Sequence, residues 1–363
     1  MQEVEKILIT SMGDEVYRYE KSIVVFFKGK RKVLSTSVYN GGYHENFTSV
    51  FNHDCTVGPG MPCEMLAPTY EGHMRIIARK LGLDPDKTSG MGTAACMDNA
   101  VSVSESYQEL TVTAVVTGGI EHNAGRPGDP ADYYKPTEKP PKPGTINILL
   151  FLDSDMPAGT ITRALVTCTE AKTAAIQELL QGSCYSQGLA TGSGTDQTII
   201  IANTDNTLYL EGAGKHAKMG ELIGRVVKQA VKAALFKQTG LSPASQHNAL
   251  RRLERFGCSR EKMWQEYLKQ QPQSILKPEF VARMGRIVTD GTVVTLVSLY
   301  AHLLDQYTWE LLSAQEAALG CQRILDILSE FFQTPGSNLQ KNFSTMGAIE
   351  SLEQLLVQKT LSL

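Results

Sequence analysis

The 363-residue chain has no uninterrupted apolar stretch of about eighteen residues, the length that a membrane-spanning helix requires. Its first twenty residues carry early acidic side chains and no long apolar segment of the kind found in secretory signal peptides. Neither sign of charge is in large excess, because the formal net charge is −3 at pH 7. This balance argues against general electrostatic binding to nucleic acid or to an anionic membrane. We therefore expect a soluble, cytoplasmic protein with neither of those partners.

The sequence also lacks the spacings of familiar metal and redox motifs. Its 7 cysteines include no CxxC pair and no zinc-finger spacing, and no HExxH sequence is present. Reduced thiols that behave as small apolar side chains are the simplest interpretation. Cys55 follows His53 and Asp54, but neighbours in sequence rarely form a catalytic dyad, so we interpret this group as structural. The sequence shows no required cofactor and leaves the binding of a divalent metal open.

The clearest pattern lies at residues 144–202. An apolar run at Ile146–Leu152 is typical of a buried strand, a helical pattern follows, and a second apolar run at Thr198–Ala202 predicts another buried strand. The loop before the second run reads ATGSGTD and carries three hydroxyls and the carboxylate of Asp196. Because open α/β sheets often bind ligands at a sheet end, we expect this loop at a binding site.

The remaining pattern predicts an α+β fold with a mixed β-sheet core and packed helices. Alternating apolar residues predict strands at 4–9, 16–27, 32–39, 110–116 and 207–210. Apolar stripes predict helices over 62–81, 90–107 and 217–237. The helix, strand and glycine-rich turn at 90–119 echo those at 169–196, which suggests an internal duplication. The Pro-rich segment at 124–144 is expected to be a long surface loop, either a lid or an ordinary excursion.

The sequence pattern becomes helical throughout after Gly240, and we expect a domain boundary there. Residues 1–240 would form the α+β domain and residues 241–363 a helical extension. Predicted helices in the extension lie at 245–256, 260–270, 278–314, 316–333 and 345–359. Such an extension would cover the core or join copies of the chain into a homo-oligomer.

Several segments together resemble the adenosylcobinamide amidohydrolase family. The matching segments are LSTSVYNGG at 34–42, TGGIEHNAGRPGDP at 117–130, GTINILL at 144–150, TEAKTAA at 169–175, ATGSGTD at 190–196 and GKHAKMGELIGRVV at 214–227. Each is weak alone, but their order makes the resemblance specific over roughly residues 20 to 237. It implies hydrolysis of the amide that joins aminopropanol to a corrinoid, giving adenosylcobyric acid in cobalamin salvage. The cobalt-containing corrinoid is then the substrate and the small-molecule partner.

Hydrolysis of an unactivated amide needs a nucleophile, donors for the developing oxyanion and an acid for the leaving amine. In the 190–196 loop, Asp196 is the leading candidate for a general base or for orienting one, with Thr195 as a second catalytic candidate. Thr191 and Ser193 are candidates for binding substrate, although the loop could equally be a turn that satisfies its own backbone donors. Glu170 is a candidate acid, since burial raises the pKa of a carboxyl group.

The segment at 117–130 is the densest polar cluster of the chain. The family resemblance carries over to Asn123, Arg126, Gly128 and Asp129 as substrate-binding candidates. His122 is a catalytic candidate that could shuttle a proton, bind a metal or approach cobalt. Polar groups from this segment and from the 190–196 loop should converge on a single pocket large enough for a tetrapyrrole, with Asn123 and Asp196 close together.

Further substrate-binding candidates are scattered along the chain: Asn40, Gly42, Asn147, Lys172 and His216. Two other functions stay open. The chain could bind a corrinoid without catalysis, as a carrier or sensor. It could also bind phosphate or a nucleotide through TGSGTD, although it lacks GxxxxGK[ST].

Overall fold

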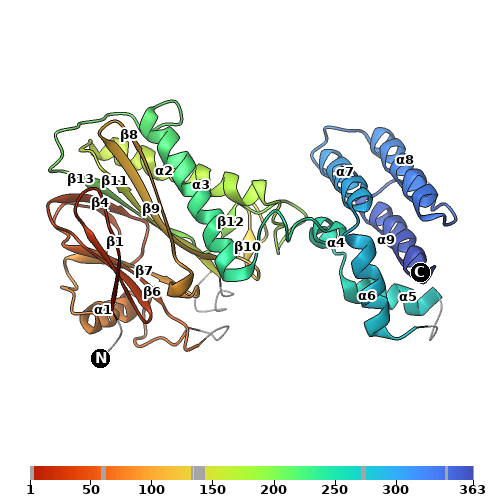
Figure 1. Ribbon diagram of the computed structural model, residues 1–363, viewed down its shortest axis with the longest axis horizontal. Helices are drawn as coiled ribbons and strands as arrows, with labels where there is room; N and C mark the ends of the chain where they lie inside the picture. The colour runs from red at the N-terminus through yellow and green to blue at the C-terminus, as the bar shows by residue number, and fades with distance from the viewer. Residues whose placement is uncertain are drawn as a thin grey trace. The chain divides into compact units, whose positions relative to one another are not determined.

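The computed structural model describes residues 4–58, 63–131, 134, 144–270, 275–339 and 342–362. The chain divides into two compact units, each with its own apolar core (Figure 1). The first comprises Met1–Tyr185 and Ala190–Ser242, and the second comprises Ser186–Leu189 and Pro243–Leu363. Mixed sheets with packed helices form the first unit and helices form the second, which confirms the predicted α+β class.

Two sheets form the first unit. The five-stranded sheet contains, in spatial order, β1 (Glu5–Ile9), β2 (Glu15–Tyr19), β3 (Ser22–Phe26), β6 (Ser49–Asp54) and β7 (Thr88–Thr93). The six-stranded sheet contains β5 (Gly42–His44), β4 (Arg31–Ser35), β13 (Gln197–Asn203), β11 (Thr145–Leu152), β9 (Leu110–Gly119) and β8 (Val101–Tyr107). A separate two-stranded pair joins β10 (Ala124–Gly125) to β12 (Gly192–Ser193). The helices of this unit are α1 (Tyr70–Lys80), α2 (Ala158–Glu178) and α3 (Lys218–Thr239), with a 3₁₀ turn at Met97–Asn99.

The two sheets pack face to face, and helices cover their outer faces (Figure 1). In β11, Leu149 and Phe151 contribute to the core shared with the five-stranded sheet. The alternate residues Ile148 and Leu150 contribute to the core shared with α2 and α3. A strand that is buried on both faces reads as a continuous apolar run, which explains why the Ile146–Leu152 pattern predicted it correctly.

Helix α1 covers the outer face of the five-stranded sheet, where Met74 packs in one cluster with Phe51. Its first turn is capped by the Thr69 hydroxyl, which accepts the Gly72 backbone N–H at 3.1 Å. The helix therefore begins at Tyr70 and not at residue 62 as predicted.

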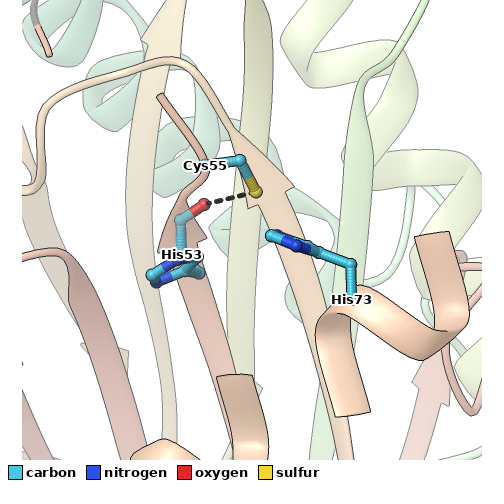
Figure 2. Close-up of side chains that lie close together, drawn as sticks. All are labelled: His53, Cys55 and His73. Carbon is cyan, nitrogen blue, oxygen red and sulfur yellow. Dashed lines mark hydrogen bonds between the residues drawn. The ribbon is translucent and has the colours of Figure 1, made fainter. Parts of the chain in front are cut away.

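A cluster of nitrogen and sulfur side chains lies where α1 meets the end of β6 (Figure 2). His53 and Cys55 come from the end of the strand and His73 comes from α1, and one donor atom of each lies within 4.8 Å of the others. The Leu66 backbone N–H donates to His73 Nδ1 at 3.0 Å, so the ring is held by the loop that precedes its own helix.

The two sheets repeat one topology. In each, an antiparallel hairpin is followed by a parallel strand–helix–strand unit: β2, β3, β6, α1, β7 in one sheet and β8, β9, β11, α2, β13 in the other. A duplication is thus visible in the order of elements. It does not pair the segments that the sequence suggested, because the helix predicted at 90–107 does not exist.

Residues 90–93 and 101–107 form strands, because small residues of the first meet a large side chain and apolar residues of the second alternate. A Cβ atom on Gly90 would lie 2.2 Å from the Phe51 ring, so the small residue is required by packing in the sheet and not by a helix. Val101 and Val103 are half-buried while Ser102 and Ser104 are exposed, the period of two that a strand shows.

Three other predicted elements differ in the structure. The strand at 16–27 is a hairpin of β2 and β3, and the strand at 207–210 is replaced by a single β-bridge between Asp155 and Tyr209. The helix at 278–314 is broken after Val288, because Asp290 caps a new helix by accepting the N–H groups of Thr292 and Val293. Much of the predicted surface loop, residues 132–133 and 135–143, lies outside the described residues.

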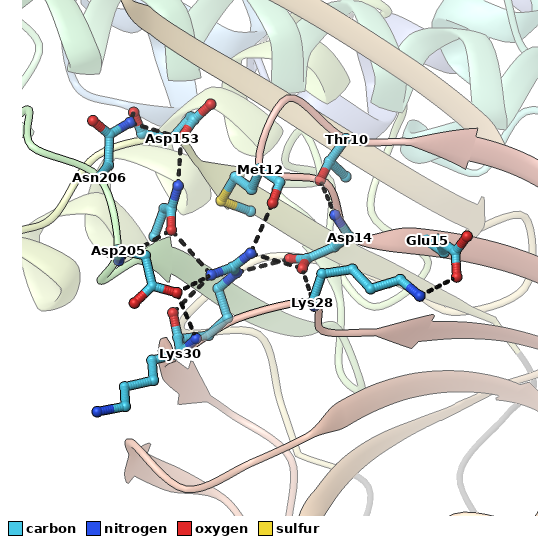
Figure 3. Close-up of polar contacts among 11 residues, drawn as sticks. Thr10, Met12, Asp14, Glu15, Lys28, Lys30, Asp153, Asp205 and Asn206 are labelled. Atoms are coloured by element: carbon cyan, nitrogen blue, oxygen red, sulfur yellow. Dashed lines mark hydrogen bonds and ion pairs between the residues drawn. The ribbon is translucent and has the colours of Figure 1, made fainter.

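A buried ion pair joins the two sheets (Figure 3). Arg31 on β4 and Asp14, in the turn between β1 and β2, are 2% and 0% exposed, and the guanidinium donates to both carboxylate oxygens at 2.9 and 2.8 Å. The remaining guanidinium N–H groups donate to the backbone carbonyls of Lys30 and Met12 and to Asn203 on β13. A buried guanidinium with every donor satisfied fixes the register between the sheets.

The second unit contains α4 (Ala249–Leu253), α5 (Arg260–Gln270), α6 (Lys277–Val288), α7 (Gly291–Thr308), α8 (Ala314–Phe332) and α9 (Thr345–Leu361), with a 3₁₀ turn at Glu254–Phe256. These helices enclose one apolar core, and a buried pair between Arg255 and Asp305 lies at its edge. Over the described part of the chain, no single helix has the length and apolar composition to cross a membrane. Only α6 and α7 taken together reach that threshold, and they are bent by 78°.

Candidate active site

A cavity of about 780 Å³ opens in the first unit where the two glycine-containing segments meet. Strand β10 from the 117–130 segment pairs with β12 from the 190–196 loop, so Ala124 lies opposite Ser193 and Gly125 opposite Gly192. The cavity is lined by Asn123, Gly125, Arg126, Pro127, Asp129, Pro130, Ala131, Thr169, Lys172, Thr173, Tyr185, Thr191, Gly192, Ser193, Gly194 and Thr195. It lies at the amino ends of the parallel strands β11 and β13, since Gly144 and Asp196 immediately precede them.

The carbonyl of Gly144 ties the two segments together. It accepts a hydrogen bond from Asn123 Nδ2 at 2.5 Å and another from Thr195 Oγ1 at 2.8 Å. Gly144 has a φ of +136°, and a Cβ atom there would lie 2.3 Å from Asn123 Oδ1. Only glycine permits this backbone conformation and this close approach. The structure thus brings Asn123 and the Thr195–Asp196 turn to one point, as the sequence led us to expect.

Asp196 is the most heavily bonded carboxylate of the site. Its Oδ1 accepts the Ile146 backbone N–H at 2.8 Å and the Ser193 hydroxyl at 2.6 Å. Its Oδ2 accepts the Ser193 backbone N–H at 3.0 Å and a charge-assisted bond from Lys172 Nζ. Both members of the Lys172–Asp196 pair are largely buried, at 12% and 9% exposure. Four donors occupy the carboxylate, so it holds the loop, the lysine and the serine hydroxyl in fixed positions.

Gly192 makes room for this ion pair. A Cβ atom on Gly192 would lie 2.2 Å from Asp196 Oδ2 and 2.7 Å from Lys172 Nζ. Gly194, two residues on, has open space around the corresponding position. The two glycines of TGSGTD therefore serve different purposes, and the first is required by the side chains that pack over it.

Asp129 shapes the opposite wall. One oxygen accepts the Arg126 backbone N–H at 2.9 Å and the Ser183 hydroxyl at 2.6 Å, and the Ser183 oxygen accepts the Tyr185 backbone N–H at 3.0 Å. This network connects the 117–130 segment to the segment that follows α2. It brings Tyr185 into the cavity lining.

Other candidates lie away from the cavity. Glu170 forms a surface ion pair with Lys215 at 3.0 Å, with the two side chains 48% and 67% exposed, an arrangement that contributes little to stability and leaves the carboxylate in solvent. Glu170 is therefore a solvated side chain on the helix surface and not the buried carboxyl group that a role as catalytic acid called for. His122 and His216 are exposed and do not line the cavity.

Two asparagines are used by the fold. Asn147 is fully buried between the sheets, where its Nδ2 donates to Asn52 Oδ1 at 2.7 Å and to the Gly92 carbonyl at 3.1 Å. Asn40 has a positive φ of 48° and donates to the carbonyls of Pro85 and Thr88. Gly42 lies on the edge strand β5 and is likewise absent from the cavity lining.

Cys168, which directly precedes the cavity-lining Thr169, is unsuited to act as a nucleophile. Cys168 on α2 is fully buried, and burial raises the pKa of its thiol to about 12. The thiolate is the reactive form, so this residue behaves as a small apolar side chain near neutral pH.

Comparison with known proteins shows the family to which this chain belongs. A family model described as adenosylcobinamide amidohydrolase matches residues 8–243. The chain belongs to the adenosylcobinamide amidohydrolase family. Every residue that lines the cavity lies within the matched range, and the match ends at the boundary between the two units.

Three individual proteins are similar to parts of this chain. The chain is 35% identical over 246 residues to an uncharacterized protein of Methanocaldococcus jannaschii, a match that covers 64% of this chain and 92% of that protein. It is 26% identical over 223 residues to the adenosylcobinamide amidohydrolase of Methanosarcina mazei, covering 59% and 95%. A crystal structure of a Pyrococcus horikoshii protein aligns with 70% of this chain and 92% of its own, at 11% identity and a TM-score of 0.32.

Sequence analysis did not identify every residue that lines the cavity. Thr169 lines the cavity from inside α2, where it donates to the Leu165 carbonyl at 3.0 Å. Thr173 and Tyr185 were missed. Thr173 is one helical turn from Thr169 and could have been found from that spacing, whereas Tyr185 lies in a loop with no motif and is placed by long-range contacts.

Proposed function

We propose that this chain hydrolyses the amide bond between aminopropanol and the corrinoid of adenosylcobinamide, giving adenosylcobyric acid. Membership of the family supports this reaction. The observation that carries the proposal is the 780 Å³ cavity formed by the two family segments, with the buried Lys172–Asp196 pair at its wall. A cavity of this volume has the size of pockets that hold drug-sized ligands.

Lys172 is the residue that we assign to the developing oxyanion. Its ammonium group has three N–H donors, and Asp196 is its one hydrogen-bond acceptor among the described residues. The others can donate to a substrate carbonyl in the cavity that Lys172 lines. The Gly194 backbone N–H, on the same wall, is a second donor, because the described residues include no acceptor for it. Fixed donors aimed at a developing charge contribute strongly to catalysis.

Ser193 is the better of the two hydroxyl nucleophiles in the loop. Its hydroxyl donates to the Asp196 carboxylate at 2.6 Å, so a base lies within reach of its proton. The Thr195 hydroxyl is bonded to the Gly144 carbonyl at 2.8 Å, and a carbonyl cannot accept that proton as a base. Attack by Ser193 Oγ on the scissile carbon would form an acyl-enzyme with the corrinoid, while the hydroxyl proton passes to Asp196. The C–N bond would break as the leaving nitrogen takes that proton, and aminopropanol would be released. Water would then cleave the acyl-enzyme to the free acid.

The deciding experiment incubates the purified full chain with adenosylcobinamide and measures both products by mass spectrometry. Release of aminopropanol with adenosylcobyric acid supports the proposal. Corrinoid binding without release would instead identify a carrier or sensor, and the absence of both from folded protein would overturn either function. Ser193→Ala should abolish turnover and Thr195→Val should retain it. Full activity in Ser193→Ala would show that Ser193 is not the nucleophile, and attack would then be assigned to water.

A further inference from the structure

A second group of reactive side chains lies outside the cavity. It gathers where β6 ends and α1 begins, and one donor atom each from His53, Cys55 and His73 lies within 4.8 Å of the other two. Figure 2 shows the His73 ring reaching from α1 toward the sulfur of Cys55. A separate cavity of about 290 Å³ adjoins this group. These residues take no part in the reaction proposed above.

His73 is buried with only one of its two ring nitrogens hydrogen-bonded to a described residue. The side chain is 2% exposed and its Nδ1 accepts the Leu66 backbone N–H at 3.0 Å. Its Nε2 is buried and has no hydrogen-bond partner among the described residues. Native proteins rarely leave a buried polar atom unsatisfied, because the atom has lost its water without replacement. A ligand that binds at Nε2 would remove this cost.

A second thiol lies beside this group. Cys63 lies opposite Thr56 in a β-bridge that folds the chain back on itself. Thr56 follows Cys55 directly, so the bridge brings Cys63 near Cys55, although Cys63 is not one of the three residues whose donor atoms lie within 4.8 Å of one another. Both cysteines are free of disulfides. Two thiols and two imidazoles form the Cys₂His₂ donor set of structural zinc sites.

We propose that His53, Cys55, Cys63 and His73 bind a divalent transition-metal ion of the zinc class. The donor chemistry selects the ion, because thiolate and imidazole favour zinc, whereas calcium and magnesium prefer oxygen ligands. In a tetrahedral zinc site, bonds of about 2.0 to 2.3 Å place neighbouring ligand atoms about 3.3 to 3.8 Å apart. The donor atoms of His53, Cys55 and His73 lie within 4.8 Å of one another and therefore need only a small inward movement. Cys63 must move farther to become the fourth ligand.

The surroundings supply the support that a ligating histidine needs. His53 Nδ1 lies 2.8 Å from the Ser22 hydroxyl on β3, so a ring N–H can donate to that oxygen while the other nitrogen binds metal. His73 must change more. Because Nδ1 now accepts the Leu66 N–H, the neutral ring carries its proton on Nε2. Ligation through Nε2 moves that proton to Nδ1, and the Leu66 amide must turn away.

The ion would fasten the connection between β6 and α1 to the sheet. In the described part of this connection, residues 55–58 and 63–69, the Thr56–Cys63 bridge pairs its two halves, and the Leu66 N–H bonded to His73 joins the second half to α1. Tyr70, the first residue of α1, accepts the Gly92 backbone N–H at 2.7 Å, and its oxygen lies 3.4 Å from Nε2 of Gln197, the residue after Asp196. Tyr70 at the start of α1 therefore reaches the start of β13, which directly follows Asp196, and the ion would hold α1 in this position.

The test measures metal binding directly and does not depend on catalysis. The full chain is reduced, stripped with a chelator, loaded with Zn²⁺, desalted and assayed for bound metal. Loading with Co²⁺ in parallel reports on the ligands. We expect one equivalent of zinc, and with Co²⁺ a thiolate charge-transfer band together with the intense visible absorption of a tetrahedral site. The melting temperature should rise on loading and fall again on chelation.

Variants assign the ligands. Loss of a hydrogen-bond partner of a metal ligand typically weakens metal binding 10- to 100-fold, and we expect this loss in Ser22→Ala. Loss of a ligand itself should weaken zinc binding by at least that much in Cys55→Ser, Cys63→Ser and His73→Gln. Cys63 is exposed, so Cys63→Ser tests the site with little risk to folding. Cys96→Ser and His216→Gln, at exposed positions outside the group, are the matched controls and should bind as the parent does. A folded parent that retains no metal, a Cys55–Cys63 disulfide that persists in place of metal binding, or equal losses in the controls would overturn the proposal.

Discussion

At the scale of single residues, the two glycines of TGSGTD offer a matched comparison. Gly192→Ala places a methyl group against the Lys172–Asp196 pair, and Gly194→Ala places one in open space. Overpacking a filled site costs roughly 1–3 kcal/mol, so we expect Gly192→Ala to lower the free energy of unfolding by that amount and to impair turnover. Gly194→Ala should stay within about 0.5 kcal/mol of the parent. Urea denaturation of both variants measures the difference, and equal stabilities would refute the packing explanation.

Lys172 can be tested against a lysine of the same region that has a different environment. Lys172→Met removes the proposed oxyanion donor while preserving the length of the side chain, so kcat should fall by about 10²–10³-fold. Lys215→Met removes only an exposed partner of Glu170 and should leave kcat unchanged. Product release under saturating adenosylcobinamide gives both values.

The stability of the two lysine variants must be measured as well. Lys172→Met leaves the largely buried Asp196 without its cation, which weakens folding independently of chemistry. A variant that is fully folded at the assay temperature but retains parental kcat would exclude the assigned role. If Lys172→Met is unfolded at the assay temperature, Lys172→Arg is measured in its place, because arginine keeps the positive charge beside Asp196.

At the scale of elements, the local sequence pattern correctly predicted the strands that are buried on both faces. It failed where a glycine is required because a large side chain from a neighbouring strand packs against it. The apolar run of β11 and the stripe of α3 lie where the sequence indicated. The glycines of β7 look like a helix of small residues until the Phe51 ring, which comes from the neighbouring strand, is known to occupy their space. No local pattern carries that information.

The buried Arg31–Asp14 pair gives a prediction at this scale, because it joins elements of different sheets. Removing one partner of a buried pair leaves an uncompensated charge, so Asp14→Ala should destabilise the chain by about 3–5 kcal/mol. The double variant Asp14→Leu with Arg31→Met removes both charges and should recover much of that loss. Denaturant unfolding of the single and double variants completes the cycle. Additive losses would show that the two side chains do not act as a pair.

At the scale of the whole molecule, the sequence predicted the convergence of two glycine-containing segments but not all that surrounds them. Asn123, Arg126 and Asp129 were named because the family resemblance covers them, and Ser193 because it lies in the polar ATGSGTD loop. Tyr185 reaches the cavity through the Asp129–Ser183 network, which exists only once the chain is folded. The roles assigned to these residues, and homo-oligomerisation through the helical region, stay predictions.

The division into two units makes a last prediction about the helical region. Among the described residues, all those that line the cavity belong to the first unit, which has apolar cores of its own in and around its sheets. A chain that ends at Ser242 should therefore fold cooperatively and cleave adenosylcobinamide within about fivefold of the full chain, a change that corresponds to about 1 kcal/mol. It loses the bond from Arg255 to the Gln187 carbonyl, so local loosening near Ser186–Leu189 is expected. Thermal unfolding and product release, measured beside the full chain, test both statements. A truncated chain that folds but does not cleave would mean that the helical unit contributes to the active site, and the reaction would then have to be assigned to both units together.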